Sequence, residues 1–410
     1  MSQRIPLSWL QLKHEKMKLC AAVAGVMVSV VLMWMQLGLM KALFASAVVF
    51  HGSMNGELVI AHSQYEHLLH SKVFSSRLLY RLRGSPDVSN VYSIYLAPGE
   101  WKNPWNGEMR SIQCYGIETD EASLKLPGIE QHLQQLRNTD VFLYDRMARP
   151  RFGDVVSSVE RHEPVELEIN RRRMSLAGVV DLGASFGVDG NVLVSHANFL
   201  RLFPKRKPGE IDIGVVKLKP GISVASAQKQ FQTLLGKEVQ VLTVEQFKEL
   251  ELIYWRSATP IGIIFTAGTV VGFFIGFIVV YQILYTDVTN HLPQYATMKA
   301  MGFSDGYLYQ LVLGQSVQLA TMGFIPGSLI AAIMYAALRK VTQLPLYMEP
   351  TRGIFLIFAT ILMCTFSGML AVRKLRSADP ADVFLTGKVK QTMQAQFTAR
   401  DHGGRNQLFL

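Results

Sequence analysis

Four long apolar segments without a charged residue most constrain what this chain can fold into. They cover residues 19–40, 261–285, 311–338 and 354–372, and none contains Asp, Glu, Lys or Arg. Each is close to the roughly 20 residues that a helix needs to cross a bilayer. Apolar residues make up 49% of the chain and charged residues only 18%, which is unusual for a soluble protein of 410 residues. The sequence therefore predicts a membrane protein with four transmembrane helices.

Basic residues at the segment ends predict the orientation. Those before the first segment are Arg4, Lys13, Lys16 and Lys18, and those after the last are Arg373, Lys374 and Arg376. Because Lys and Arg are enriched on the cytoplasmic side, we expect both termini in the cytoplasm (N-in, C-in). Three basic residues in the short outer loop oppose this assignment: Arg339, Lys340 and Arg352.

The four segments divide the chain into nine regions. In order, we expect a cytoplasmic N-terminus (1–18), the first transmembrane helix with a stalk (19–50), an extracytoplasmic domain (51–257), the second helix (258–285), a polar cytoplasmic segment (286–306), the third helix (307–338), an outer loop (339–352), the fourth helix (353–372) and a cytoplasmic tail (373–410). The first segment could instead be a signal peptide, since Ala45-Ser46-Ala47 has the form of a cleavage site. Its apolar stretch of about 22 residues exceeds the 7 to 15 of a signal, so we favour a retained anchor that continues outward as a stalk.

The extracytoplasmic domain is expected to be α+β. A strand, a helix and a strand are predicted near its start (56–61, 75–83, 88–96) and again near its end (210–218, 224–235, 238–242), with a further strand at 109–116. Between them, residues of about 121–208 contain a predicted helix (130–137) and strands (165–169, 175–180, 191–195), which we expect to form an inserted second lobe. A final helix, 244–255, leads into the second transmembrane helix.

Charge and motifs exclude several functions. The net charge is +10, but in residues 51–257 basic and acidic residues almost balance, so the excess lies near the membrane ends and in the tail and does not indicate a nucleic-acid partner. The histidines form no HExxH pattern, and no G-x-S-x-G or nucleotide-binding G-x-x-x-x-G-K-[ST] is present. We therefore expect no enzyme, no metal and no cofactor in this chain, and any ATP with its Mg²⁺ to be bound by a partner.

Small residues recur every four positions in two of the transmembrane segments. They are Gly268, Gly272 and Gly276 in the second and Gly323, Gly327 and Ala331 in the third. Such a stripe lets helix backbones approach closely. The pattern fits either a homodimer interface or ordinary packing within one helix bundle, and the sequence does not decide between them.

Three motifs resemble a known family. Residues 295–316 (YATMKAMGFSDGYLYQLVLGQS) resemble FtsX-like permeases, especially the exporters related to MacB. Residues 286–305 (TDVTNHLPQYATMKAMGFSD), 142–153 (FLYDRMARPRFG) and 373–384 (RKLRSADPADVF) are similar to the DevC subfamily. The chain differs from MacB, which carries its ATPase in the same polypeptide, and residues 290–294 are less charged than the FtsX-like pattern.

The resemblance implies the permease subunit of a type VII ABC transporter in the inner membrane, with its large domain in the periplasm. Such a permease works as a homodimer with a separate ATPase. DevC-like permeases also imply a periplasmic adaptor (membrane-fusion) protein, a TolC-type outer-membrane channel and glycolipid or other lipid-like cargo. Two alternatives are an FtsX-like scaffold that regulates a periplasmic enzyme and a lipoprotein-releasing permease.

The resemblance also makes residues 286–306 the segment that couples the permease to its ATPase. The ATPase-facing residues that it implies are His291, Gln294, Tyr295, Met298, Lys299 and Met301. Gly302 has a separate physical interpretation, because glycine commonly caps the C-terminus of a helix. The alternative is a solvated connector in which Met298 and Met301 face the membrane.

Overall fold

The computed structural model describes residues 16–161 and 163–376. Most of the predicted N-terminus (1–18) and cytoplasmic tail (373–410) lies outside these residues, as does the end of the 373–384 motif. The described chain forms two compact units. We call the first, which comprises residues up to 38, 265–335 and those from 347 onward, the membrane unit; the second, 39–264 with 336–346, is the outer unit.

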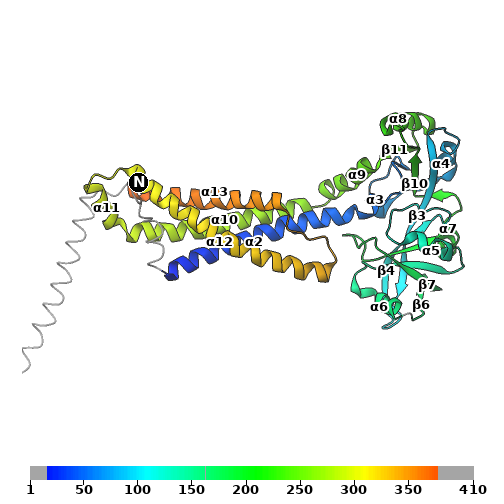
Figure 1. Cartoon of the computed structure of the whole chain (residues 1–410), viewed down its shortest axis with the longest axis horizontal. Coiled ribbons are helices and arrows are strands. Elements are labelled where there is room, and N and C mark those ends of the chain that lie inside the picture. Colours follow the sequence, from blue (N-terminus) through cyan, green and yellow to red (C-terminus); the bar gives the residue numbers. More distant parts are fainter. Residues whose placement is uncertain (1–15, 162, 377–410) are drawn as a thin grey trace, which may run out of the picture. The chain divides into compact units, whose positions relative to one another are not determined.

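Four long helices side by side form the membrane unit (Figure 1). They are α2 (Lys16–Ala47), α10 (Ile261–Asn290), α12 (Asp305–Thr342) and α13 (Pro350–Arg376). Each contains a stretch long and apolar enough to cross a bilayer, which confirms the four predicted transmembrane helices. α2 is unbroken over 32 residues, as the prediction of a first helix with a stalk requires.

All four helices extend past at least one end of the predicted spans, and two of these extensions bear on the segments between them. α10 continues through residues 286–290, and the hydroxyls of Thr286 and Thr289 donate to the carbonyls of Gln282 and Tyr285, one turn earlier, at 2.8 and 2.7 Å. These bonds let polar side chains lie on a helix without leaving their hydrogen-bonding groups unpaired. α12 runs on to Thr342, so the non-helical part of the predicted outer loop is 343–349.

A mixed sheet forms the outer unit. Among the described residues nine strands make up this sheet, in the order β11-β1-β10-β3-β4-β8-β5-β7-β6. Their bounds are β1 (Leu58–His62), β3 (Val88–Lys102), β4 (Met109–Ile117), β5 (Val141–Asp145), β6 (Glu166–Ile169), β7 (Arg172–Val180), β8 (Asn191–Ser195), β10 (Ile213–Leu218) and β11 (Val239–Thr243). The short strands β2 (Phe74–Ser75) and β9 (Glu210–Ile211) pair separately. Sheet and helices confirm the predicted α+β class.

The two ends of the outer unit interleave. β1 leads through α4 (Ser76–Leu82) to β3, and β10 leads through α8 (Val224–Leu235) to β11. β1 lies between β10 and β11 and is antiparallel to both, while β10 lies between β1 and β3. This is the split β-α-β arrangement, in which each half supplies a strand to the middle of the other. Neither half can complete its part of the sheet alone.

The inserted residues extend the same sheet. The second half of the long strand β3 pairs with β4. On its other side β4 pairs in parallel with β8, which is the strand of the insertion that lies next to β4 in the sheet. Further helices are α5 (Ile129–Leu136), α6 (Val155–Glu160) and α7 (His196–Leu202). One hydrophobic cluster contains both Phe142 of β5 and Phe231 of α8, so the insertion and the two ends share a core. The division into two lobes stays a prediction.

Candidate coupling site

A short helix separates α10 from α12 in the membrane unit. This helix, α11, spans Leu292–Ala300. Pro293 has no N–H for the hydrogen-bond ladder of α10, but a proline is tolerated in the first turn of a new helix. At the junction the His291 ring nitrogen Nδ1 lies 2.9 Å from the Asp287 carbonyl oxygen and 3.3 Å from its carboxylate oxygen Oδ1. The predicted polar segment is therefore a folded helical connector.

Tyr295 anchors this connector. Its side chain is only 1% exposed, and it packs against the buried Leu311 of α12, with Met298 and Tyr307 partly buried beside them. Burial raises the pKa of Tyr295, whose hydroxyl has no hydrogen-bond partner among the residues that the structure describes. A phenol kept neutral and packed in this way joins α11 to the start of α12.

The end of α11 presents apolar side chains to the surface. Met301 is 65% exposed, and Phe303, two residues on, is also exposed. Between them Gly302 has φ +93°, and the Phe303 N–H donates to the Met298 carbonyl at 3.1 Å. These features are those of a Schellman C-cap, as predicted from Gly302.

The predicted coupling residues thus differ in their surroundings. Tyr295 and Met298 point into the connector's own core, whereas Gln294 and Met301 are exposed. His291 is partly buried at the α10–α11 junction, and Lys299 lies in the last turn of α11. Contact of any of these residues with an ATPase stays a prediction.

Both small-residue stripes face α2 of the same chain. A Cβ atom at Gly268 or Gly276 would lie 2.5 Å from Gln36 or Ser29, and Gly272 approaches Leu32. On α12, a Cβ at Gly327 would lie 3.0 Å from the Met27 carbonyl oxygen, and Ala331 is fully buried. The Ser29 hydroxyl also donates to the Gly272 carbonyl at 2.6 Å. Within the described chain both stripes therefore pack on α2, and a role in a homodimer interface stays a prediction.

Replacing Gly323 with alanine should destabilise the bundle by about 1–3 kcal/mol, because the new Cβ would overlap a packed neighbour. That Cβ would lie 2.5 Å from Val26 Cβ, and Val26 is fully buried on α2. The free energy of unfolding can be measured by denaturant titration of the detergent-solubilised chain. Gly353→Ala on α13 is the control, since its Cβ would make an ordinary 3.6 Å contact with Trp34. In a double-mutant cycle with Val26→Gly, which removes that Cβ, the combined loss should be smaller than the sum of the two single losses; additive losses would contradict the contact.

A buried polar cluster in the outer unit ties two segments that adjoin transmembrane helices. His51 lies in α3 (Val49–Gly52), just after α2, and Glu251 lies in α9 (Val244–Ser257), just before α10. His51 Nε2 is 3.2 Å from Glu251 Oε2 and 3.1 Å from the Tyr65 hydroxyl. Glu251 also accepts from Tyr65, from the Leu68 N–H and from the Trp255 indole at 2.9 to 3.2 Å. We call these residues the α3–α9 cluster.

Hydrogen bonds decide the charge state of this cluster. Burial alone would raise the pKa of Glu251, but its bonds from His51, Trp255 and Leu68 outweigh burial and lower it. Burial and the nearby Glu251 carboxylate raise the pKa of Tyr65. Glu251 is therefore a buried carboxylate, only 2% exposed, with its lone pairs satisfied. Sequence reasoning did not single out His51 or Glu251; the available signal was an acidic residue one turn after Phe247 on the buried face of α9.

The residues from 253 to 380 match the family model described as the FtsX-like permease C-terminal domain. This part of the chain is an FtsX-like permease domain. The match includes α10, the connector α11, α12 and α13. It supports an ABC-type permease, and with the four apolar helices it makes the chain a multi-pass protein of the inner membrane.

Two solved structures are similar to part of this chain. The periplasmic region of MacB from Actinobacillus actinomycetemcomitans is 17% identical, covers 48% of this chain and 93% of its own, and has a TM-score of 0.35. The extracellular domain of the ABC-type transporter YknZ from Gram-positive bacteria is 16% identical, covers 45% and 98%, and has a TM-score of 0.32. No curated protein sequence matches the chain. The described residues hold no cluster of three or more His, Cys, Asp or Glu suited to a metal ion.

Proposed function

We propose that this chain is the permease subunit of an ATP-driven exporter and that its connector receives the motion of a separate ATPase. The folded connector within an FtsX-like permease domain carries the proposal. It has the two features that a coupling element needs, which are an exposed apolar end at Met301 and an internal anchor at Tyr295. A load applied at Met301 would reach α12 through the Tyr295–Leu311 contact.

The outer unit would receive this motion through the chain segments that enter and leave it. α9 leads directly into α10, and α3 follows α2. Since the α3–α9 cluster joins the two segments by buried hydrogen bonds, they would move together when α2 and α10 move. The outer unit would then act on cargo by a mechanical stroke, with ATP hydrolysed in the partner.

We further propose a DevC-type export assembly. It comprises two copies of this chain, a periplasmic adaptor protein and a TolC-type outer-membrane channel, and it carries glycolipid or other lipid-like cargo. The motifs at 142–153 and 286–305 support this part of the proposal. The first motif contributes strand β5 to the sheet, and the second forms the end of α10 and the connector.

Reconstitution with a candidate ABC ATPase from the same genome tests the function. In lipid nanodiscs we expect the ATPase to bind the permease and its hydrolysis rate to change several-fold on addition of the chain. Neither binding nor a changed rate would contradict the proposal. Deletion of the gene in cells distinguishes the scaffold alternative, because an exporter requires lost export with normal periplasmic enzyme activity, and a scaffold requires the reverse.

A further inference from the structure

Strand β11 is the open end of the outer unit's sheet. In the part of the chain that the structure describes, β11 pairs with β1 on one side and with no strand on the other. The opposite end of the sheet is closed, because β6 pairs back onto β3. An open edge presents backbone N–H and carbonyl groups on which another polypeptide strand can pair.

The sequence of this edge favours such pairing. Residues 239–243 (VQVLT) are uncharged, contain no proline or glycine and include three β-branched residues, which suit a strand. Natural edge strands are usually protected by a lysine, a proline or a bulge. β11 has none of these, and its register with β1 is unbroken from Thr243, opposite Leu58, to Val239, opposite His62. Its protection must come from elsewhere in the fold.

A glutamine side chain takes the place of a neighbouring strand. Alternate residues of a strand turn their backbone groups to opposite sides, so those of Val239, Val241 and Thr243 face the open edge. The amide of Gln232, on α8, donates to the Val239 carbonyl at 2.9 Å and accepts from the Val241 N–H at 2.8 Å. One residue of a parallel neighbouring strand would make the same two bonds.

A second glutamine of α8 extends this cap. The Nε2 of Gln228 donates to the Val241 carbonyl at 2.8 Å and to Oε1 of Gln246 at 2.6 Å. Gln246 also accepts from the Thr243 N–H at 2.9 Å. Together with Gln232, these amides satisfy edge-facing groups along the length of β11.

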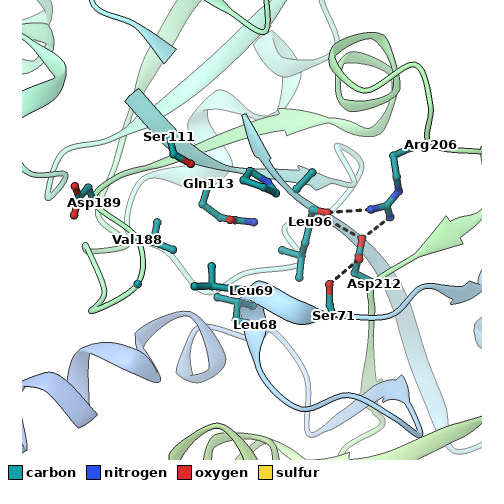
Figure 2. A pocket seen from close by; sticks show the side chains of 13 residues that line it. Leu68, Leu69, Ser71, Leu96, Ser111, Gln113, Val188, Asp189, Arg206 and Asp212 are labelled. Carbon is teal, nitrogen blue, oxygen red and sulfur yellow. Dashed lines mark hydrogen bonds and ion pairs between the residues drawn. The ribbon is translucent and has the colours of Figure 1, made fainter. Parts of the chain in front are cut away.

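Another interruption of strand pairing is closed by charged side chains. Beyond the end of the β3–β10 pairing, the Leu96 N–H donates to Asp212 at 2.7 Å and the Leu96 carbonyl accepts from Arg206 at 3.1 Å, as Figure 2 shows. Arg206 and Asp212 are ion-paired at 2.6 Å, and Asp212 is only 2% exposed. A buried ion pair is costly to break, whereas the glutamine amides are neutral and not buried. Of the two caps, the one on β11 is therefore the one that a competing strand can displace.

We infer that Gln228 and Gln232 keep the β11 edge closed to strand addition by a second copy of this chain. The interaction surface is the outer edge of β11, and its occupant once the glutamines are lost is the same edge of the second copy. Identical edges related by a two-fold axis are self-complementary, and an uncharged strand meets no like charge in its copy. The inference goes beyond the proposed function, because it involves no ATP, ATPase or cargo.

Fluorescence energy transfer between nanodiscs tests the inference. The full chain is placed in two populations of nanodiscs, one with donor-labelled and one with acceptor-labelled lipids, so that only association between discs gives a signal. We expect the double variant Gln228→Ala/Gln232→Ala to associate at concentrations about tenfold lower than the unmodified chain, since the amide bonds no longer compete with an added strand.

A peptide identifies the surface that associates. A peptide of residues 237–244 should inhibit association of the double variant, and the same peptide with Val241→Pro should not, because proline lacks the N–H that strand pairing needs. Equal association of the double variant and the unmodified chain would overturn the inference. Association that the unmodified peptide does not inhibit would also overturn it.

Further variants separate the edge from the helix. Gln230→Ala is the matched control, since Gln230 is exposed on α8 and takes no part in the bonds to β11, and it should behave as the unmodified chain does. Adding Gln240→Lys to the double variant places a charge on β11 and should abolish association. Association that persists with Gln240→Lys would overturn the inference.

Hydrogen exchange decides the matter if the double variant does not fold. In Gln232→Ala alone, the Val241 amide loses its acceptor and should exchange about fivefold faster in the full chain. The Val241 amide in Gln230→Ala should exchange as in the unmodified chain. Unchanged exchange of Val241 in Gln232→Ala would overturn the inference.

Discussion

Met301→Asp should weaken binding of the ATPase by about 100-fold, equivalent to about 3 kcal/mol, and abolish export without preventing membrane insertion. The carboxylate would lose its hydration on entering an apolar contact. Met301 is 65% exposed, so this substitution disturbs little of the permease's own packing. ATPase affinity can be measured by surface-immobilised nanodiscs, and insertion by protease protection.

Three variants isolate the effect of position 301. Met301→Leu keeps an apolar contact and should retain export. Leu234→Asp places the same charge on an exposed apolar site of α8 in the outer unit and should leave ATPase affinity unchanged. Met298→Asp should also uncouple hydrolysis from export, but Met298 packs with Tyr295 and Leu311, so its effect includes lost packing. Normal export in both aspartate variants would contradict the proposed contact.

Glu251→Leu should destabilise the outer unit by about 3 kcal/mol, because it removes the shared acceptor of the α3–α9 cluster. The N–H groups of Leu68 and Trp255 would then be buried without this acceptor. For a unit of this size the midpoint of thermal unfolding should fall by about 8 °C, measurable by near-UV circular dichroism of the full chain. Glu249→Leu is the matched control, since Glu249 lies on the same helix in an exposed pair with Arg256 and should shift the midpoint little. Equal midpoints for the two variants would contradict the role assigned to the cluster.

The stability difference should also depend on pH. The pKa of Glu251 is lowered in the folded chain, so its ionisation stabilises the fold above its unfolded pKa of about 4.3. This contribution is lost as the pH falls through the lowered folded value. The difference in unfolding free energy between the native chain and Glu251→Leu should therefore shrink as the pH falls below about 4.3. A difference that grows on acidification would contradict the assignment.

Export provides a second measurement for the same cluster. If α3 and α9 transmit motion together, a milder substitution that leaves the outer unit folded should still reduce export. Glu251→Gln keeps the acceptor oxygen of an amide but removes the charge that His51 faces at 3.2 Å. We expect reduced export per turnover of ATP with an unchanged ATPase affinity, in contrast to Met301→Asp.

Much of the secondary structure could be predicted because local patterns determine it. The uncharged apolar runs define the four long helices, and strands such as β3 and β10 have the β-branched and aromatic composition of buried strands. The predicted helix at 244–255 corresponds to α9 (Val244–Ser257), whose Thr243 and Gln246 form a capping box. Strand β5 (Val141–Asp145), in contrast, was not predicted, although four of its five residues belong to the 142–153 motif.

The site could be predicted only in part. The position of Gly302 as a helix C-cap followed from the chemistry of glycine, and the polar interruption between two apolar runs located the connector. Which of its methionines faces inward could not be predicted, because the burial of Met298 and the exposure of Met301 depend on how α11 packs on α12. The same holds for the small-residue stripes, whose spacing fits either an internal or an intermolecular contact.

The sequence by itself determined the membrane class, the helices and most strands, because hydrophobic run length and local periodicity act over a few residues. Only the tertiary structure decided that β1 lies between β10 and β11 and that Glu251 meets His51. His51 and Glu251 are 200 positions apart in the chain, and the paired residues Leu58 and Val216 are 158 apart. These contacts form only when the whole domain folds and its strands pair, so they cannot be predicted from a local sequence pattern.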